Sequence, residues 1–114
     1  MENRPNILLV CGKNKKRSRT AEFIFKNDSR FNIRSVGVSP NSIRKITEND
    51  LNWSDLVLVM ENEHKSKIKE LFRKINNIKI EVLNIEDEFE FMDEELVIIL
   101  TEAINDRINI NFGI

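Results

Sequence analysis

Two short runs of this sequence contain no polar residue: residues 7–10 read ILLV and residues 56–60 read LVLVM. Runs of this length are typical of strands, and a strand that is apolar throughout is buried on both of its faces. The first strand is expected at residues 6–10, directly after Pro5, and another at residues 56–60. Strands of this kind occur in parallel sheets that helices cover on both sides, so the two runs restrict the chain to the α/β class.

The segments around these runs alternate between helix and strand patterns. Further strands are expected at residues 32–37, which end at a glycine, and at residues 78–83. Helices are expected at residues 18–26, from Thr47 onward, at residues 63–73 and at residues 93–108. This alternation predicts a three-layer α/β/α sandwich with a central four-stranded parallel sheet. The length of 114 residues suffices for one such domain, which we expect to span residues 1–114.

Local signals support the helices. Thr47 offers a hydroxyl cap with Asp50 three residues later, the spacing of a capping box. The two later helices each have an apolar face. The predicted core residues are Ile68, Leu71, Phe72 and Ile75 in the 63–73 helix, and Leu96, Leu100, Ala103 and Ile104 in the 93–108 helix.

Composition excludes several classes of protein. Apolar residues make up 40% and charged residues 32% of the chain, with a net charge of −1, which argues against disorder and against a globally basic nucleic-acid binder. The start MENRPN is polar, and no apolar run approaches the roughly 18 residues of a membrane span. One cysteine and one histidine provide no disulfide and no cluster of metal ligands. We therefore expect a cytoplasmic protein with no membrane partner, no metal and no cofactor.

The segment after the first strand carries the chemistry that the sequence predicts. It reads CGKNKKRS, residues 11–18, and a predicted helix follows it. Backbone N–H groups in such a loop and at the helix N-terminus bind anions, and a cysteine at the base of the loop has its thiolate stabilised. Arg17 can place two donors on a phosphate, and the Ser18 hydroxyl can donate to the thiolate of Cys11. The alternative is that Cys11 is only a small apolar residue at a strand end.

This pattern resembles that of the low-molecular-weight protein tyrosine phosphatases, whose loop reads C-x-G-N-x-C-R-S. Cys11, Asn14, Arg17 and Ser18 match that loop, and the resemblance continues in Ser35-Val36-Gly37, in LVLVM and in the acidic segment after the fourth strand. It covers roughly residues 6–104. It implies the strand order 2-1-3-4, Cys11 as the nucleophile, Arg17 as the phosphate clamp, and Asn14 as the residue that holds the loop. The phosphate-binding residues that it implies are Gly12, Lys13, Asn14, Lys15, Lys16, Arg17 and Ser18.

Phosphatases of this kind also need an acid to protonate the leaving oxygen. The family takes it from an Asp-Pro-aromatic stretch, and the matching residues here are Asp87, Glu88 and Phe89, so the resemblance implies Asp87. Glu86 and Asp93 are alternative acids, and a merely solvated acidic loop is another reading. Lys16 stands where the family has a second cysteine, and the chain has no tyrosine. No aromatic residue follows Gly37, which leaves Phe89 and Phe91 for one wall of the site.

Two charge clusters bear on the partners. The cations are Lys13, Lys15, Lys16, Arg17 and Arg19, and the acids are Glu86, Asp87, Glu88, Glu90, Asp93, Glu94 and Glu95. The lysines can draw phosphate toward a cleft or simply face water. The acids, near the same rim, would repel a nucleic acid. His64 falls on the apolar stripe of its helix and is expected to be a core-edge residue.

The leading hypothesis is a phosphomonoester hydrolase acting through a phosphocysteine, on a phosphorylated protein or a small aryl phosphate, with phosphate-like oxyanions as further ligands. A non-catalytic phosphate- or phosphoprotein-binding module would keep the loop but lack a working acid. Arsenate reduction is a third reading, and it needs an external thiol because the chain has only Cys11. Hydrolysis of a phosphotyrosine side chain is the default activity.

Overall fold

The computed structural model describes residues 4–114, so the interpretation of the polar N-terminus rests partly on residues outside this range. Four parallel strands form one sheet in the order β2-β1-β3-β4, which confirms the predicted α/β fold and strand order. The strands are β1 (Asn6–Cys11), β2 (Asn32–Gly37), β3 (Leu56–Val59) and β4 (Ile80–Val82). The helices are α1 (Arg17–Phe25), α2 (Glu48–Trp53), α3 (Asn62–Leu71) and α4 (Glu94–Phe112).

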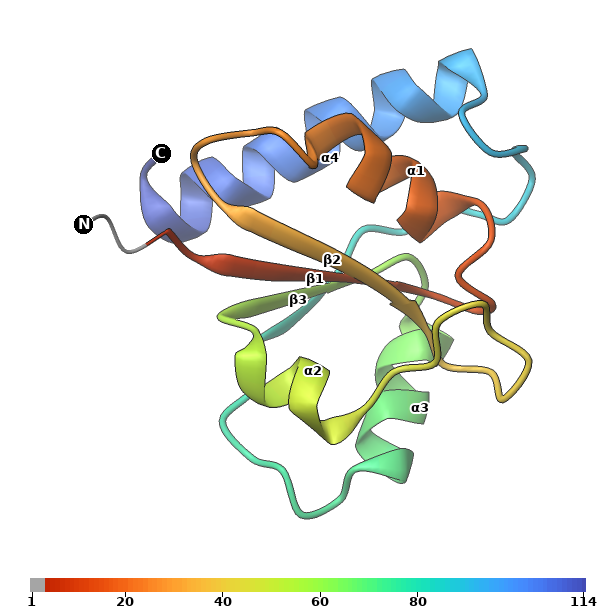
Figure 1. Cartoon of the computed structure of the whole chain (residues 1–114), viewed down its shortest axis with the longest axis vertical. Coiled ribbons are helices and arrows are strands. Elements are labelled where there is room, and N and C mark those ends of the chain that lie inside the picture. Colours follow the sequence, from red (N-terminus) through yellow and green to blue (C-terminus); the bar gives the residue numbers. More distant parts are fainter. Residues whose placement is uncertain (1–3) are drawn as a thin grey trace.

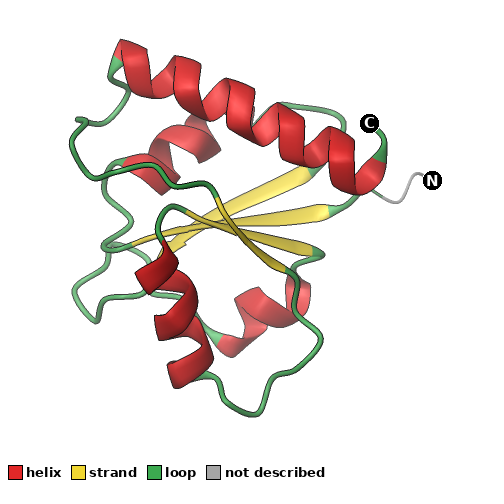
Figure 2. Ribbon diagram, turned by 180° about the vertical axis from the view of Figure 1, so that it is seen from behind, coloured by secondary structure: helices red, strands yellow, loops and turns green. Residues whose placement is uncertain are grey.

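The helices cover both faces of the sheet, with α1 and α4 on one side and α2 and α3 on the other (Figures 1 and 2). Successive side chains of a strand point to opposite faces, so β1 contributes to two cores. Ile7 and Leu9 pack in the core beneath α1 and α4, whereas Leu8 and Val10 pack in the core above α2 and α3. All four side chains are fully buried, which accounts for the apolar run at residues 7–10. Because the side chains of β1 are apolar on both faces, its sequence suits a central position in the sheet.

The register of the sheet brings three chain segments to one edge. Cys11 is level with Gly37 of β2, and Val10 is level with Val59 of β3. The carboxyl ends of these strands therefore lie side by side, and each continues into a loop there. Ligands of open parallel sheets bind at this edge.

The capping box predicted at Thr47 is present. The Thr47 hydroxyl accepts a hydrogen bond of 3.2 Å from the Asp50 N–H, and the Asp50 carboxylate accepts one of 2.9 Å from the Thr47 N–H. The Asp50 carboxylate also lies 3.2 Å from Arg34 of β2. These contacts fix the start of α2 against the sheet.

Three predicted elements have bounds that differ from the structure by two residues or more at one end. The 63–73 helix ends at Leu71, whose side chain is 39% exposed, while Phe72 and Ile75 pack on the core from beyond the helix. The fourth strand is only Ile80–Val82. The last helix continues past Ile108 to Phe112 and ends where Gly113 adopts a left-handed backbone with φ of 70°, as helix-terminating glycines do. Its buried face is Leu96, Leu100, Ile104 and Ile108, with Ala103 only partly buried.

No helix within residues 4–114 is long and apolar enough to cross a membrane.

Candidate active site

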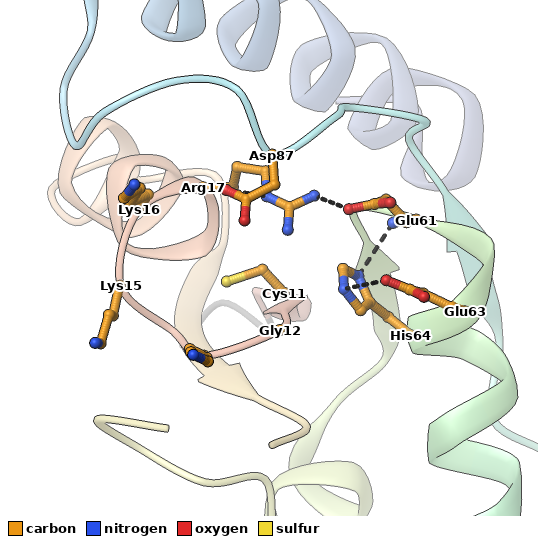
Figure 3. A pocket seen from close by; sticks show the side chains of 10 residues that line it. Cys11, Gly12, Lys15, Lys16, Arg17, Glu61, Glu63, His64 and Asp87 are labelled. Carbon is orange, nitrogen blue, oxygen red and sulfur yellow. Dashed lines mark hydrogen bonds and ion pairs between the residues drawn. The ribbon is translucent and has the colours of Figure 1, made fainter. Parts of the chain in front are cut away.

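A cavity of about 530 Å³ opens at the carboxyl end of β1, directly above Cys11. Figure 3 shows Cys11 at its centre, with Arg17 and Asp87 on one side and His64 on the other. The residues that line it are Cys11, Gly12, Lys13, Lys15, Lys16, Arg17, Glu61, Glu63, His64 and Asp87. They come from the loop after β1, the start of α1, the start of α3 and the segment after β4. The fold thus gathers residues from four parts of the sequence around one thiol.

The backbone after Cys11 is arranged to bind an anion. The carbonyl oxygens of Cys11, Gly12 and Lys13 accept hydrogen bonds from Val38, Ser39 and Ile43 at 3.1, 2.9 and 3.1 Å. The N–H and C=O of a trans peptide point in opposite directions, so the N–H groups of the same peptide units point away from the 38–43 segment. None of the backbone N–H groups of residues 12–16 has an acceptor among residues 4–114. Such a row of unpaired donors beside a helix N-terminus forms an anion-binding nest.

A buried network of hydrogen bonds holds this loop. The Asn14 amide donates to the hydroxyls of Ser18 at 2.8 Å and Ser35 at 3.0 Å, and Ser35 in turn donates to the Glu22 carboxylate. Asn14 has a left-handed backbone with φ of 55°, which asparagine tolerates better than most residues. The Ser18 hydroxyl lies 3.0 Å from the Cys11 sulfur. The network therefore sets both the curvature of the loop and the surroundings of the thiol.

Gly37 allows the loop to pack this closely on β2. A Cβ atom at this position would lie 2.2 Å from the Ser42 hydroxyl oxygen and 2.8 Å from backbone atoms of both Lys13 and Asn14. Backbone atoms cannot rotate away as a flexible side chain can. A side chain here would push the loop away from β2.

We expect Gly37→Ala to destabilise the protein by about 1–3 kcal/mol, the usual cost of forcing atoms into a packed site. Urea denaturation would measure this loss. Gly12→Ala is the matched control, because a Cβ atom there would have a single neighbour at an ordinary contact distance of 3.8 Å. An equal loss of stability in both variants would contradict the steric explanation.

The guanidinium group of Arg17 is buried above the cysteine and only partly paired. The residue is 4% exposed. Its Nη1 donates to the Glu61 carboxylate and to the Ile85 carbonyl oxygen at 2.8 Å. Its Nε has no hydrogen-bond partner among residues 4–114, and the Asp87 carboxylate lies 3.7 Å away. A buried, unpaired N–H of a charged group is costly, and a ligand oxygen is what would satisfy it.

Of the three candidate acids, only Asp87 lies in the cavity. The Asp93 side chain instead caps α4 by accepting hydrogen bonds from the N–H groups of Glu95 and Leu96. Glu86 is exposed and is not among the lining residues. The geometry thus favours Asp87, which is itself a solvent-exposed side chain.

The two aromatic residues expected on the rim lie elsewhere. Phe89 packs against the core beneath α1 and α4. Phe91 stacks on Phe23 at 6.1 Å between ring centroids, with the Arg19 guanidinium 5.3 Å from its ring. Within residues 4–114, no phenylalanine or tryptophan lines the cavity above Cys11.

The lysines of the 11–18 segment surround the opening of the cavity. Lys13, Lys15 and Lys16 all line it, and Lys16 forms an ion pair of 3.2 Å with Glu90. These cations share the cavity with the carboxylates of Glu61, Glu63 and Asp87, so the positive charge is concentrated on the side that the 11–18 segment forms.

Sequence reasoning missed Glu61, and it predicted the burial of His64 but not its position beside the cavity. Both follow β3, and the signal available was that polar residues after a buried parallel strand lie at the ligand-binding edge. Burial, followed by the charge of Arg17, lowers the pKa of His64, whereas Glu61, Glu63 and Asp87 raise it by smaller amounts. Glu61, Glu63 and His64 place ligand atoms within 4.8 Å of one another, but the Glu61 carboxylate is already paired with Arg17. The Glu61 carboxylate therefore supports the arginine.

Comparison with known proteins gives a fold but no sequence relative: no family model and no curated protein matches the chain. Among solved structures, the low-molecular-weight protein tyrosine phosphatase SP-PTP from Streptococcus pyogenes superposes with a TM-score of 0.79 at 19% identity, covering 95% of this chain and 93% of that one. The YwlE arginine phosphatase from Geobacillus stearothermophilus gives 0.72 at 20% identity, over 92% and 93% of the two chains. The tyrosine phosphatase Wzb from Escherichia coli K30, solved with phosphate, gives 0.72 at 20% identity, over 92% and 96%.

The chain is thus an α/β protein with a loop of backbone N–H groups, unpaired within residues 4–114, at the carboxyl edge of its sheet. More particularly, it has the fold of the low-molecular-weight protein tyrosine phosphatases, as the resemblance of the 11–18 segment implied.

Proposed function

We propose that this protein is a phosphomonoester hydrolase of the low-molecular-weight protein tyrosine phosphatase type, with residues 1–114 as its catalytic domain and a phosphocysteine as its intermediate. One observation carries the proposal. A buried guanidinium whose Nε has no partner among residues 4–114 lies over a cysteine, and the N–H groups of the loop after that cysteine are likewise unpaired within this range. This set of donors is complementary to the oxygens of a phosphoryl group.

Each residue of the site has a separate role in the proposed reaction. The Cys11 thiolate attacks phosphorus, so that an S–P bond forms while the bond from phosphorus to the leaving oxygen breaks. Arg17 and the loop N–H groups stabilise the charge on the equatorial oxygens, and Asp87 gives its proton to the leaving oxygen. Water then attacks phosphorus and gives a proton to Asp87, and the S–P bond breaks to release phosphate and the thiolate. The hydroxyl of Ser18, 3.0 Å from the sulfur, stabilises the thiolate in both steps.

Phosphotyrosine in a protein is the default substrate, and a small aryl phosphate is the simplest probe. Two of the superposed structures are described as tyrosine phosphatases and one as an arginine phosphatase. Phosphate-like oxyanions should bind the same loop, with no metal or other cofactor taking part.

A second candidate is a non-catalytic module that binds phosphate or phosphoproteins. The surroundings of Asp87 favour this second candidate. The Asp87 side chain is 60% exposed, and Glu88 follows it at the position where the family has proline. Such a module would keep the phosphate-binding loop and lose only the acid. Arsenate reduction with an external thiol is less well supported, because Cys11 is the only cysteine of the chain.

Asp87→Asn tests the choice between enzyme and module. If Asp87 is the acid, this variant should hydrolyse an aryl phosphate about 100-fold more slowly, the usual contribution of a general acid. The rate should be measured across pH with no metal added. Glu86→Gln is the matched control, because Glu86 lies outside the cavity, and its rate should stay within about twofold of the wild-type rate.

Each alternative has its own outcome. Equal rates for the wild type and Asp87→Asn would mean that another residue is the general acid. Phosphate binding without turnover of any ester would establish the module. Absence of both turnover and oxyanion binding would overturn the phosphate-binding interpretation altogether.

A further inference from the structure

A second cavity adjoins the one above Cys11. It has a volume of about 430 Å³ and lies between the 38–40 segment and α3. Gly12, Lys13, Glu63 and His64 line both cavities. A substrate whose phosphate sits over Cys11 can therefore continue across Gly12 into this second space.

Gly12 is a glycine that the fold does not require. Its φ is not positive, and a Cβ atom there would have one neighbour within 4 Å, the His64 Nε2 at 3.8 Å. Gly37, by contrast, has no room for any side chain. Because Gly12 has no side chain, the Nε2 edge of the His64 ring is left uncovered. Any longer side chain at this position would screen it.

His64 presents a hydrogen-bond donor to this space. Its Nδ1 accepts a hydrogen bond of 3.1 Å from the Glu61 N–H, so the neutral ring carries its proton on Nε2. Burial lowers the pKa of His64, which keeps the ring neutral at neutral pH. The residue is 3% exposed, yet its Nε2 has no hydrogen-bond partner among residues 4–114. Figure 3 shows the ring directed toward the loop at Gly12 and Cys11.

An acceptor lies beside this donor. The Glu63 carboxylate is 4.0 Å from His64 Nε2, which is too long for a hydrogen bond between them. A donor and an acceptor placed side by side match the main chain of an extended residue, because such a residue points its own N–H and C=O in the same direction. Val38 and Pro40 supply the apolar wall opposite.

We propose that this second cavity is a main-chain subsite, in which His64 Nε2 donates to a carbonyl oxygen and Glu63 accepts from an N–H of a peptide next to the phosphorylated residue. The proposal rests on the proposed function and deepens it, because it makes the substrate a phosphorylated peptide segment rather than a free aryl phosphate. A guanidinium group fits less well, since it has no acceptor for the His64 donor. No phenylalanine or tryptophan among residues 4–114 lines either cavity, so contacts to the peptide main chain replace ring packing as the source of affinity.

Equilibrium binding tests this subsite without requiring turnover. The probes are a short peptide carrying a non-hydrolysable phosphonate mimic of phosphotyrosine, benzylphosphonate, and inorganic phosphate, each titrated by calorimetry. The wild-type protein should bind the peptide about tenfold more tightly than benzylphosphonate, the effect of one or two hydrogen bonds. His64→Leu and Glu63→Ala should remove most of this ratio. His64→Gln, whose amide can place a donor near the same point, should restore part of it.

The outcomes separate the subsite from the phosphate loop. If the ratio is unchanged in both His64→Leu and Glu63→Ala while phosphate still binds, the subsite is wrong and the proposed function stands. If His64→Leu weakens all three probes by the same factor, His64 is structural and the subsite is again wrong. If the wild-type protein binds none of the probes, including inorganic phosphate, the proposed function is wrong, and the subsite proposal, which depends on it, is wrong as well.

Discussion

Cys11→Ser should lower the hydrolysis of an aryl phosphate by at least about 10⁴-fold, because a serine hydroxyl here has no base to activate it. Of the carboxylates that line the cavity, Glu61 and Asp87 lie near Arg17 and Glu63 lies beside His64, and the hydrogen-bond partner of the Cys11 sulfur is the Ser18 hydroxyl at 3.0 Å. A hydroxyl beside another hydroxyl stays protonated at neutral pH. Steady-state hydrolysis of an aryl phosphate by the two proteins would measure the loss.

Binding of inorganic phosphate provides the control for this variant. The N–H groups of residues 12–16 and the Arg17 guanidinium are unchanged by the substitution, so calorimetry should still detect phosphate. A Cys11→Ser protein that retains a tenth of the wild-type rate would refute the phosphocysteine intermediate. It would point instead to direct attack by water.

The central sheet could be predicted because its strands are defined by burial. The β2 strand has the predicted bounds, residues 32–37, and β1 and β3 differ from their predictions by one residue at one end. The fourth strand was predicted too long because it lies at the edge of the sheet, where only Ile80–Val82 pair with β3. Apolar residues on either side of it, such as Ile78 and Leu83, pack on the cores from loops. Periodicity cannot distinguish such residues from strand residues.

The site residues of the 11–18 segment could be predicted from sequence, whereas the residues that face them across the cavity could not. Cys11, Asn14, Arg17 and Ser18 lie within one segment, and their roles depend mainly on local geometry. Glu61 and His64 are about 50 positions away and reach the cavity only because β3 lies next to β1 in the sheet. The apolar stripe of α3 correctly indicated that His64 is buried. It could not indicate that the ring faces a cavity rather than the core.

The seven acids after β4 illustrate how a charge cluster separates into different roles. Asp87 faces Arg17, Glu90 pairs with Lys16, and Asp93 caps α4. Glu94 and Glu95 occupy the first turn of α4, where negative charge favours a helix. All seven side chains are exposed, so the cluster is a solvated face, and several of its members also make specific local contacts. Which acid enters the cavity depends on the path of the loop, which composition does not specify.

Arg17→Lys should reduce the rate of aryl phosphate hydrolysis by about 10³-fold while the charge of the protein stays the same. The guanidinium uses Nη1 for Glu61 and for the Ile85 carbonyl, and this leaves Nε for the phosphoryl group. A lysine ammonium is a single centre without this fork, so it cannot keep both structural contacts and a directed donor to the substrate. The loss should appear in kcat as well as in KM, because the donors stabilise charge that develops in the transition state.

Arg19→Lys is the matched control for this substitution. Arg19 lies two residues further along α1, is exposed, and contacts the ring of Phe91 outside the cavity. It should change the rate by no more than about twofold, since exposed substitutions away from a site have small effects. If Arg17→Lys and Arg19→Lys have similar rates, positive charge near the opening is sufficient and the fork is not needed. If Arg17→Lys alone is slow, the geometry that Glu61 and Ile85 impose on the guanidinium contributes to the rate beyond its charge.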